Sequence, residues 1–123
     1  MHNVLLAIDG SKPSIEAAKL LAHLPHPDSL DLTVLSVVQR PFIHSSYATG
    51  ELLEKAFERD KAFANETYAQ VAEMFEGANA KLNHTVREGP VGESIVEIAT
   101  VKKSDLVVVG AKGHSQITRL LLG

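Results

Sequence analysis

The chain has 123 residues, which is enough for one domain with a single buried core and too few for two. A net charge of −3 provides no basic surface for nucleic acid, and the absence of cysteine excludes disulfides, Cys-ligated zinc, iron–sulfur clusters and thiol catalysis. No run of about 18 apolar residues could cross a membrane and no signal peptide is recognisable, so we expect a cytoplasmic protein without nucleic-acid or membrane partners.

Short apolar runs alternate along the chain with segments in which apolar residues recur at helical spacing. The runs are typical of strands that are buried on both faces, and the periodic segments are typical of helices packed against them. Prolines and turn residues separate the two kinds of segment. In chain order we expect a strand at 4–8, a helix at 13–24, a strand at 32–38, a loop at 40–50, a helix at 52–76, a strand at 82–87, a helix at 91–102, a strand at 105–109 and a short helical run at 116–122.

This order of elements predicts a doubly wound, open parallel α/β sheet of the Rossmann-like kind, with strand order 3-2-1-4. The fourth strand, 105–109, is the most apolar, and at the border of the sheet it would expose backbone groups beside apolar side chains. We therefore expect the natural chain to continue past Gly123 into a further helix and a fifth strand. Residues 1–123 would then form one domain that lacks these last two elements.

The carboxyl ends of the strands are where an open parallel sheet binds ligands. The richest of these ends is GAKGHS at 110–115, directly after the fourth strand. Glycines let backbone N–H groups approach a phosphate closely, and a following helix would add a favourable dipole. A pair of glycines after a strand is also common in tight turns, so this pair alone leaves both interpretations open.

The longer pattern GAKGHSQITRLLLG resembles the nucleotide-binding signature of the universal stress protein family. The segments VLLAIDGS, LSVV and VREGPVGESIVEIA are similar to the same family, so the resemblance covers essentially the whole chain. It implies an ATP-binding regulatory protein of the stress response with little or no turnover. It also implies a homodimer. Mg or Mn could accompany ATP, bound through its phosphates.

The resemblance assigns the phosphate end of the nucleotide to the glycines. Gly110 and Gly113 would line the ribose and phosphates, and Gly123 would begin the remaining phosphate contacts. Lys112 and His114 lie in the same loop and could neutralise phosphate charge, although side chains at a loop tip are commonly just solvated.

The other end of the nucleotide is assigned to the first two strands. Val37 would meet adenine through its backbone, and Asp9 would take the sugar or the adenine. A carboxylate repels phosphate but accepts hydrogen bonds from hydroxyl and amino groups, which agrees with this division. Asp9 could instead only cap the turn into the first helix, where Ser11 is the expected N-cap. The chain has Ser36 where the family often has His.

Two other functions stay open from the sequence. One is a nucleotide-free, dimeric interaction protein in which the glycines serve only the turn. The other is an enzyme related to the ATP pyrophosphatases and nucleotidyl transferases, but Asp9 stands where their first loop should hold phosphate, and no H-x-G-H is present. We expect no catalytic residue, because no histidine follows Ser11 in a recognisable base position and no G-x-S-x-G elbow is present. We expect no metal ligand in the chain itself, because its six histidines are scattered.

Overall fold

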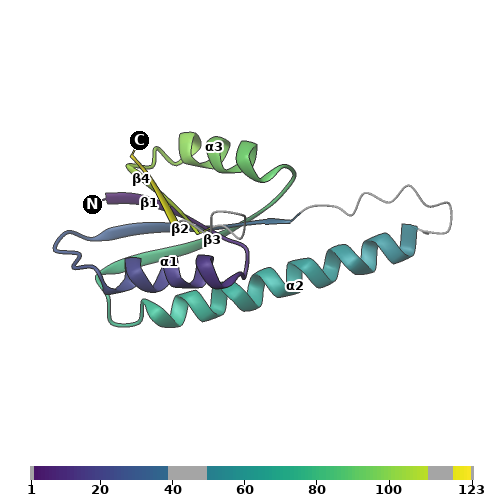
Figure 1. Ribbon diagram of the computed structural model, residues 1–123, viewed down its shortest axis with the longest axis horizontal. Helices are drawn as coiled ribbons and strands as arrows, with labels where there is room; N and C mark the ends of the chain where they lie inside the picture. Colours follow the sequence, from purple (N-terminus) through teal and green to yellow (C-terminus); the bar gives the residue numbers. More distant parts are fainter. Residues whose placement is uncertain (1, 39–49, 111–117, 123) are drawn as a thin grey trace.

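The structure is a computed structural model that describes residues 2–38, 50–110 and 118–122, the last of these by their backbone (Figure 1). Strands and helices alternate up to the fourth strand, as the apolar pattern predicts. The elements are β1 (His2–Ile8), α1 (Lys12–His23), β2 (Leu30–Val38), α2 (Gly50–Met74), β3 (Ala80–Glu88), α3 (Val91–Val101), β4 (Leu106–Gly110) and β5 (Thr118–Leu122).

One sheet joins all five strands in the order β3-β2-β1-β4-β5. The pairs β2–β3, β1–β2 and β1–β4 are parallel, so the predicted order 3-2-1-4 and the doubly wound α/β class are confirmed. The register places Ile8 beside Ser36 and Ala7 beside Val109. The carboxyl ends of β1, β2 and β4 therefore lie at one edge of the sheet.

The predicted helical run at 116–122 is wrong, because residues Thr118–Leu122 form β5. This strand pairs antiparallel with β4, from Gly110 beside Thr118 to Leu106 beside Leu122. A helix of so few residues is unstable by itself, whereas an extended segment satisfies the backbone groups on the open side of β4. The apolar edge that motivated a missing strand is thus paired within the chain, while a continuation past Gly123 stays a prediction.

Helices cover the two faces of the sheet unequally. In Figure 1, α1 and α2 lie on one face and α3 lies alone on the other. Alternate residues of β2, Leu30, Leu32 and Val34, join the core beneath α1 and α2, while Leu35 joins a smaller core beneath α3. The intervening positions on the α3 face include Asp31 and Thr33. The α3 face is therefore apolar under its helix and polar beside it.

The described residues contain neither a membrane-spanning helix nor a cluster of metal-binding side chains. None of the helices there is long and apolar enough to cross a bilayer. Those same residues contain no group of three or more His, Asp or Glu side chains that could hold a metal ion.

Candidate functional site

Three of the six predicted site residues meet at the carboxyl edge of the sheet. Asp9 follows β1, Val37 lies near the end of β2, and Gly110 is the last residue of β4. Gly113 and His114 fall outside the described residues, between Gly110 and Thr118 in the sequence. Gly110 and Thr118 pair with each other at this same edge.

The sixth predicted site residue is Gly123, which follows β5 in the sequence. Gly123 also lies outside the described residues. It follows Leu122, which pairs with Leu106 at the amino end of β4. β5 therefore carries the chain away from the edge that holds Asp9, Val37 and Gly110.

Val37 presents a backbone carbonyl at this edge. The last pair of β1 and β2 is Ile8 with Ser36, so β2 extends beyond β1 by Val37 and Val38. The carbonyl of Val38 accepts a hydrogen bond from the backbone of Gly89, on the β3 side, at 3.2 Å. Successive carbonyls of a strand point to opposite sides, so that of Val37 faces the side where β1 has ended. It can accept a hydrogen bond from a ligand.

Asp9 begins the turn between β1 and α1. Its Oδ1 accepts a hydrogen bond from the backbone N–H of Ser11 at 2.9 Å, which is the capping role that the sequence also allowed. The side chain is exposed, and Oδ1 is the only carboxylate oxygen of Asp9 that is bonded within the described part of the chain. Oδ2 is therefore available to a ligand, so the two interpretations of Asp9 are compatible.

Ser14 is a residue of this turn that the sequence reasoning missed. It is fully buried, and its hydroxyl donates to the carbonyl of Ser11 at 3.0 Å and accepts from the backbone N–H of Asp9 at 3.4 Å. Ser11 is the N-cap of α1, as predicted, because its Oγ accepts from the backbone N–H of Ser14 at 3.4 Å. The sequence signal for these hydrogen bonds was a second serine, Ser14, three residues after the predicted N-cap Ser11.

Gly110 is required by packing. A Cβ at this position would lie 2.2 Å from the carbonyl oxygen of Pro13 and 2.8 Å from the Cα of Ser14. These are backbone atoms in the first turn of α1, so no side-chain rotation can relieve the contact. The absent side chain lets the end of β4 lie directly against the start of α1, beside the turn that carries Asp9.

A partly buried polar contact lies beneath α2, between β2 and β3. Ser36 Oγ and His84 Nε2 are 2.9 Å apart, and the His84 ring stacks on Tyr68 with centroids 4.3 Å apart. Burial lowers the pKa of His84, because the charged imidazolium loses water there. The contact joins β2, β3 and α2, and it gives Ser36 a structural role that the sequence reasoning did not assign.

The chain has the strand order and the crossover helices of the Rossmann-like α/β class. Folds of this class bind ligands at the carboxyl ends of their parallel strands. The model of the universal stress protein family matches residues 1–123, and the chain belongs to that family. Universal stress protein MJ0531 of Methanocaldococcus jannaschii is 30% identical over 122 residues, which cover 98% of this chain and 70% of that protein.

Solved structures of this family share the fold. Universal stress protein UspA from Lactobacillus plantarum has a TM-score of 0.79 at 23% identity, covering 99% of this chain and 85% of its own. The Arabidopsis thaliana family member At3g01520, solved with AMP bound, has a TM-score of 0.67 at 15% identity, covering 94% and 80%. A universal stress protein in complex with cAMP has a TM-score of 0.62 at 17% identity, covering 86% and 73%.

Proposed function

We propose that this chain is an adenine-nucleotide-binding regulatory protein of the stress response, with ATP as its ligand and little or no turnover. The observation that carries the proposal is the carbonyl of Val37, which has no backbone partner among the described residues on the side where β1 ends. It lies at the edge that also holds Asp9 and Gly110. The AMP and cAMP bound by two structural relatives favour the same class of ligand.

The donors and acceptors at this edge suit the two ends of a nucleotide. The amino group of adenine would donate to the carbonyl of Val37, and a ribose hydroxyl would donate to Oδ2 of Asp9. A carboxylate repels phosphate, so the phosphates would lie away from Asp9, near the segment after Gly110. There the backbone at Gly113 and the side chain of His114 would contact them, with Mg or Mn held through the phosphates alone.

Gly123 has a conditional place in this proposal. It follows β5, which runs away from the site along β4. Gly123 therefore reaches the phosphates only when residues 118–122 leave the edge of β4. The proposal further includes a homodimer and a cytoplasmic location, which the family resemblance implies.

Calorimetric titration with ATP, AMP and cAMP, each with magnesium, tests the proposal. We expect saturable binding of ATP, and we expect Asp9→Ala to weaken it by roughly tenfold, since a hydrogen bond to a charged group contributes about 1.5 kcal/mol or more. Asp28→Ala is the matched control, because Asp28 is an exposed carboxylate at the amino edge of the sheet, where it meets His2.

A second variant examines the phosphate end. Gly113→Val adds a branched side chain where the proposal needs bare backbone, so it should reduce affinity for ATP more than affinity for adenosine. Absence of ATP binding at millimolar ligand would reject the proposal in favour of a nucleotide-free interaction protein.

A further inference from the structure

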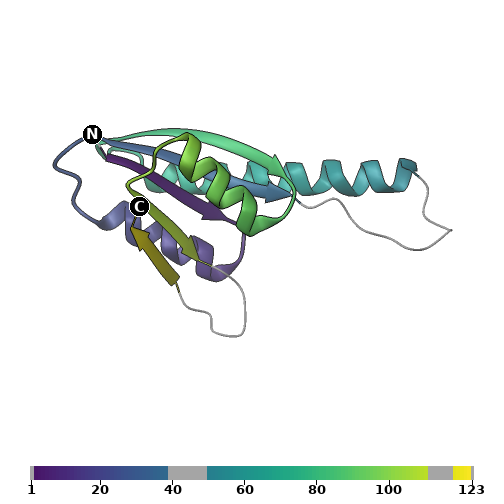
Figure 2. The same cartoon turned by 90° about the horizontal axis from the view of Figure 1, so that it is seen from above.

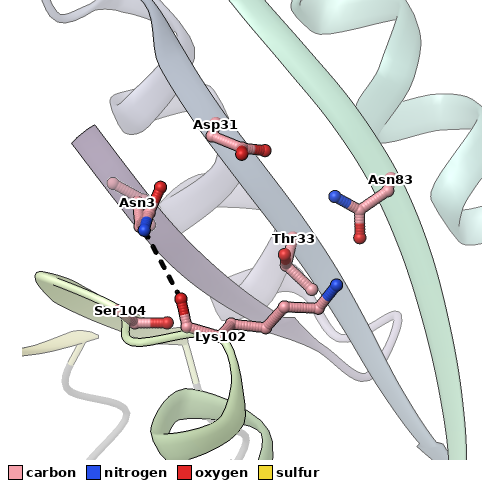
Figure 3. A pocket seen from close by; sticks show the side chains of 7 residues that line it. Asn3, Asp31, Thr33, Asn83, Lys102 and Ser104 are labelled. Carbon is pink, nitrogen blue, oxygen red and sulfur yellow. Dashed lines mark hydrogen bonds between the residues drawn. The ribbon is translucent and has the colours of Figure 1, made fainter. Parts of the chain in front are cut away.

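A polar pocket lies at the opposite edge of the sheet from the candidate nucleotide site. Its cavity volume is about 60 Å³, and it opens on the α3 face between the amino ends of β1 and β2 and the turn after α3 (Figure 3). A cavity of this size holds roughly four water molecules or a ligand of a few non-hydrogen atoms. Its lining residues are Asn3, Val4, Asp31, Thr33, Asn83, Lys102 and Ser104.

Thr33 lies at the floor of this pocket with its hydroxyl unused. The residue is 95% buried, at 5% exposure, and its side chain makes no hydrogen bond within the described part of the chain. The adjacent Asn83, which is its Cα partner on β3, also has a side-chain amide without a partner there. No buried side-chain polar atom in the described part of the chain lacks a partner, so the Thr33 hydroxyl and the Asn83 amide are accessible from the pocket and can bond to an occupant.

Two opposite charges lie in the same pocket without pairing. Neither the carboxylate of Asp31 nor the ammonium group of Lys102 forms an ion pair with any described residue, and Asp31 does not pair with Lys81, its Cα partner on β3. In Figure 3 the Lys102 side chain extends over the sheet toward Thr33 and Asn83, while Asp31 lies nearer to Asn3.

The pocket is thus divided into two ends. The Lys102 ammonium and the Thr33 hydroxyl provide donors at one end, and the amide nitrogen of Asn83 lies between this end and Asp31. At the other end, Asp31 lies beside Asn3, whose amide nitrogen already donates to the carbonyls of Lys102 and Lys103 at 3.4 and 3.5 Å. The Asn3 oxygen and the Asp31 carboxylate are left as acceptors. Asp31 and Thr33, which mark these two ends, are two residues apart on β2, a separation of roughly 7 Å along the strand.

We propose that this pocket binds a small zwitterion of the α-amino acid class. The carboxylate of the ligand meets Lys102, Thr33 and Asn83, and its ammonium group meets Asp31 and the Asn3 oxygen. A lone anion of the same size would face Asp31, and a lone cation would face Lys102, so each would meet a like charge. The site is independent of the nucleotide proposal, because the two lie at opposite edges of the sheet.

Titration with glycine, followed by ¹⁵N–¹H correlation spectra of the labelled chain, tests this proposal. We expect saturable shifts of the side-chain amide signals of Asn3 and Asn83, with a dissociation constant on the order of 1 mM. Acetate and methylammonium each carry one of the two charges and should bind roughly tenfold more weakly or not at all.

Variants identify the contacts. Lys102→Gln and Asp31→Asn should each weaken glycine binding roughly tenfold, while Lys103→Gln, at a neighbouring lysine that does not line the pocket, should leave it unchanged. The backbone spectrum of each variant shows directly that the fold is retained. The proposal is overturned if glycine causes no saturable shift up to about 50 mM, if acetate or methylammonium alone binds equally well, or if Lys102→Gln binds like the parent chain.

Discussion

The two faces of the sheet use the same strands for different purposes. Under α1 and α2, every inward position of β2 from Leu30 to Val34 belongs to an apolar core. On the other face, α3 covers Leu35 but leaves Asp31 and Thr33 beside an open pocket. Figure 2, which views the sheet from above, shows that α3 crosses only part of it. One strand can therefore carry a dry core and a polar binding surface at alternate residues.

We expect the largest change in stability at Gly110, because the start of α1 leaves no room for a side chain there. Gly110→Ala places a Cβ against the Pro13 backbone and should lower the free energy of unfolding by about 3 kcal/mol. Urea denaturation measures this change. Gly92→Ala, in α3, is the matched control, because its Cβ would meet nothing within 4 Å. It should be neutral or stabilise by up to about 1 kcal/mol. Equal effects would show that the two faces tolerate added volume alike.

A pair of neighbouring substitutions on β2 compares the faces directly. Val34→Thr introduces a hydroxyl into the core beneath α1 and α2, which should cost about 1–3 kcal/mol. Thr33→Val removes an unpartnered hydroxyl from the α3 face and should change stability by less than about 0.5 kcal/mol. Thermal and urea unfolding of both variants provide the comparison. A loss at Thr33 as large as that at Val34 would contradict the division between faces.

The pH dependence of stability reports the polar contact beneath α2. Because the pKa of His84 is lower in the folded chain, the unfolded chain takes up a proton first as the pH falls. The stabilisation that neutral His84 provides is therefore complete above its ordinary value of 6.5 and declines below it, until the pH reaches the lower folded pKa.

Urea unfolding of the parent chain and of His84→Gln between pH 5 and 8 isolates this contribution. The stability difference between the two should shrink below pH 6.5. A difference that stays constant, or grows, as the pH falls would show that His84 does not titrate as its burial indicates.

The smallest effect is expected at the rim of the α3 face. Arg87 on β3 pairs with Glu97 on α3, and both side chains are partly exposed. Such pairs contribute little because water screens them, so Glu97→Gln should cost less than about 1 kcal/mol, and added salt should reduce the difference further. Denaturation with urea at low and high salt measures it. A larger, salt-independent loss would place this pair among the interactions that hold α3 on the sheet.

Much of the fold was predictable because its signals are local. Each buried strand is a short apolar run, and the parallel order brings Asp9, Val37 and Gly110 to one edge without further information. The third strand was predicted too short, at 82–87, because charged residues, Lys81 and Glu88, stand next to the ends of the predicted range. The helix at 116–122 was wrong because pairing with β4 outweighs a weak local preference.

Parts of the site depended on contacts between distant segments. Gly110 was assigned to a ligand from its place in a motif, whereas its contact with the Pro13 backbone appears only when β4 lies against α1. The pocket at Asn3, Asp31 and Lys102 likewise combines three segments that no sequence spacing relates. Parallel topology predicts which strand ends meet, but it does not predict which side chains remain without partners.

The most direct measurement is an ATP titration, with magnesium, followed by backbone ¹⁵N–¹H correlation spectra. We expect saturable shifts at Asp9, Gly10 and Gly110 and in the residues after Val37, with none at Asp31 or Asn83. Shifts confined to the amino edge of the sheet, or none at millimolar ATP, would contradict the claim that the carboxyl ends of β1, β2 and β4 hold an adenine nucleotide.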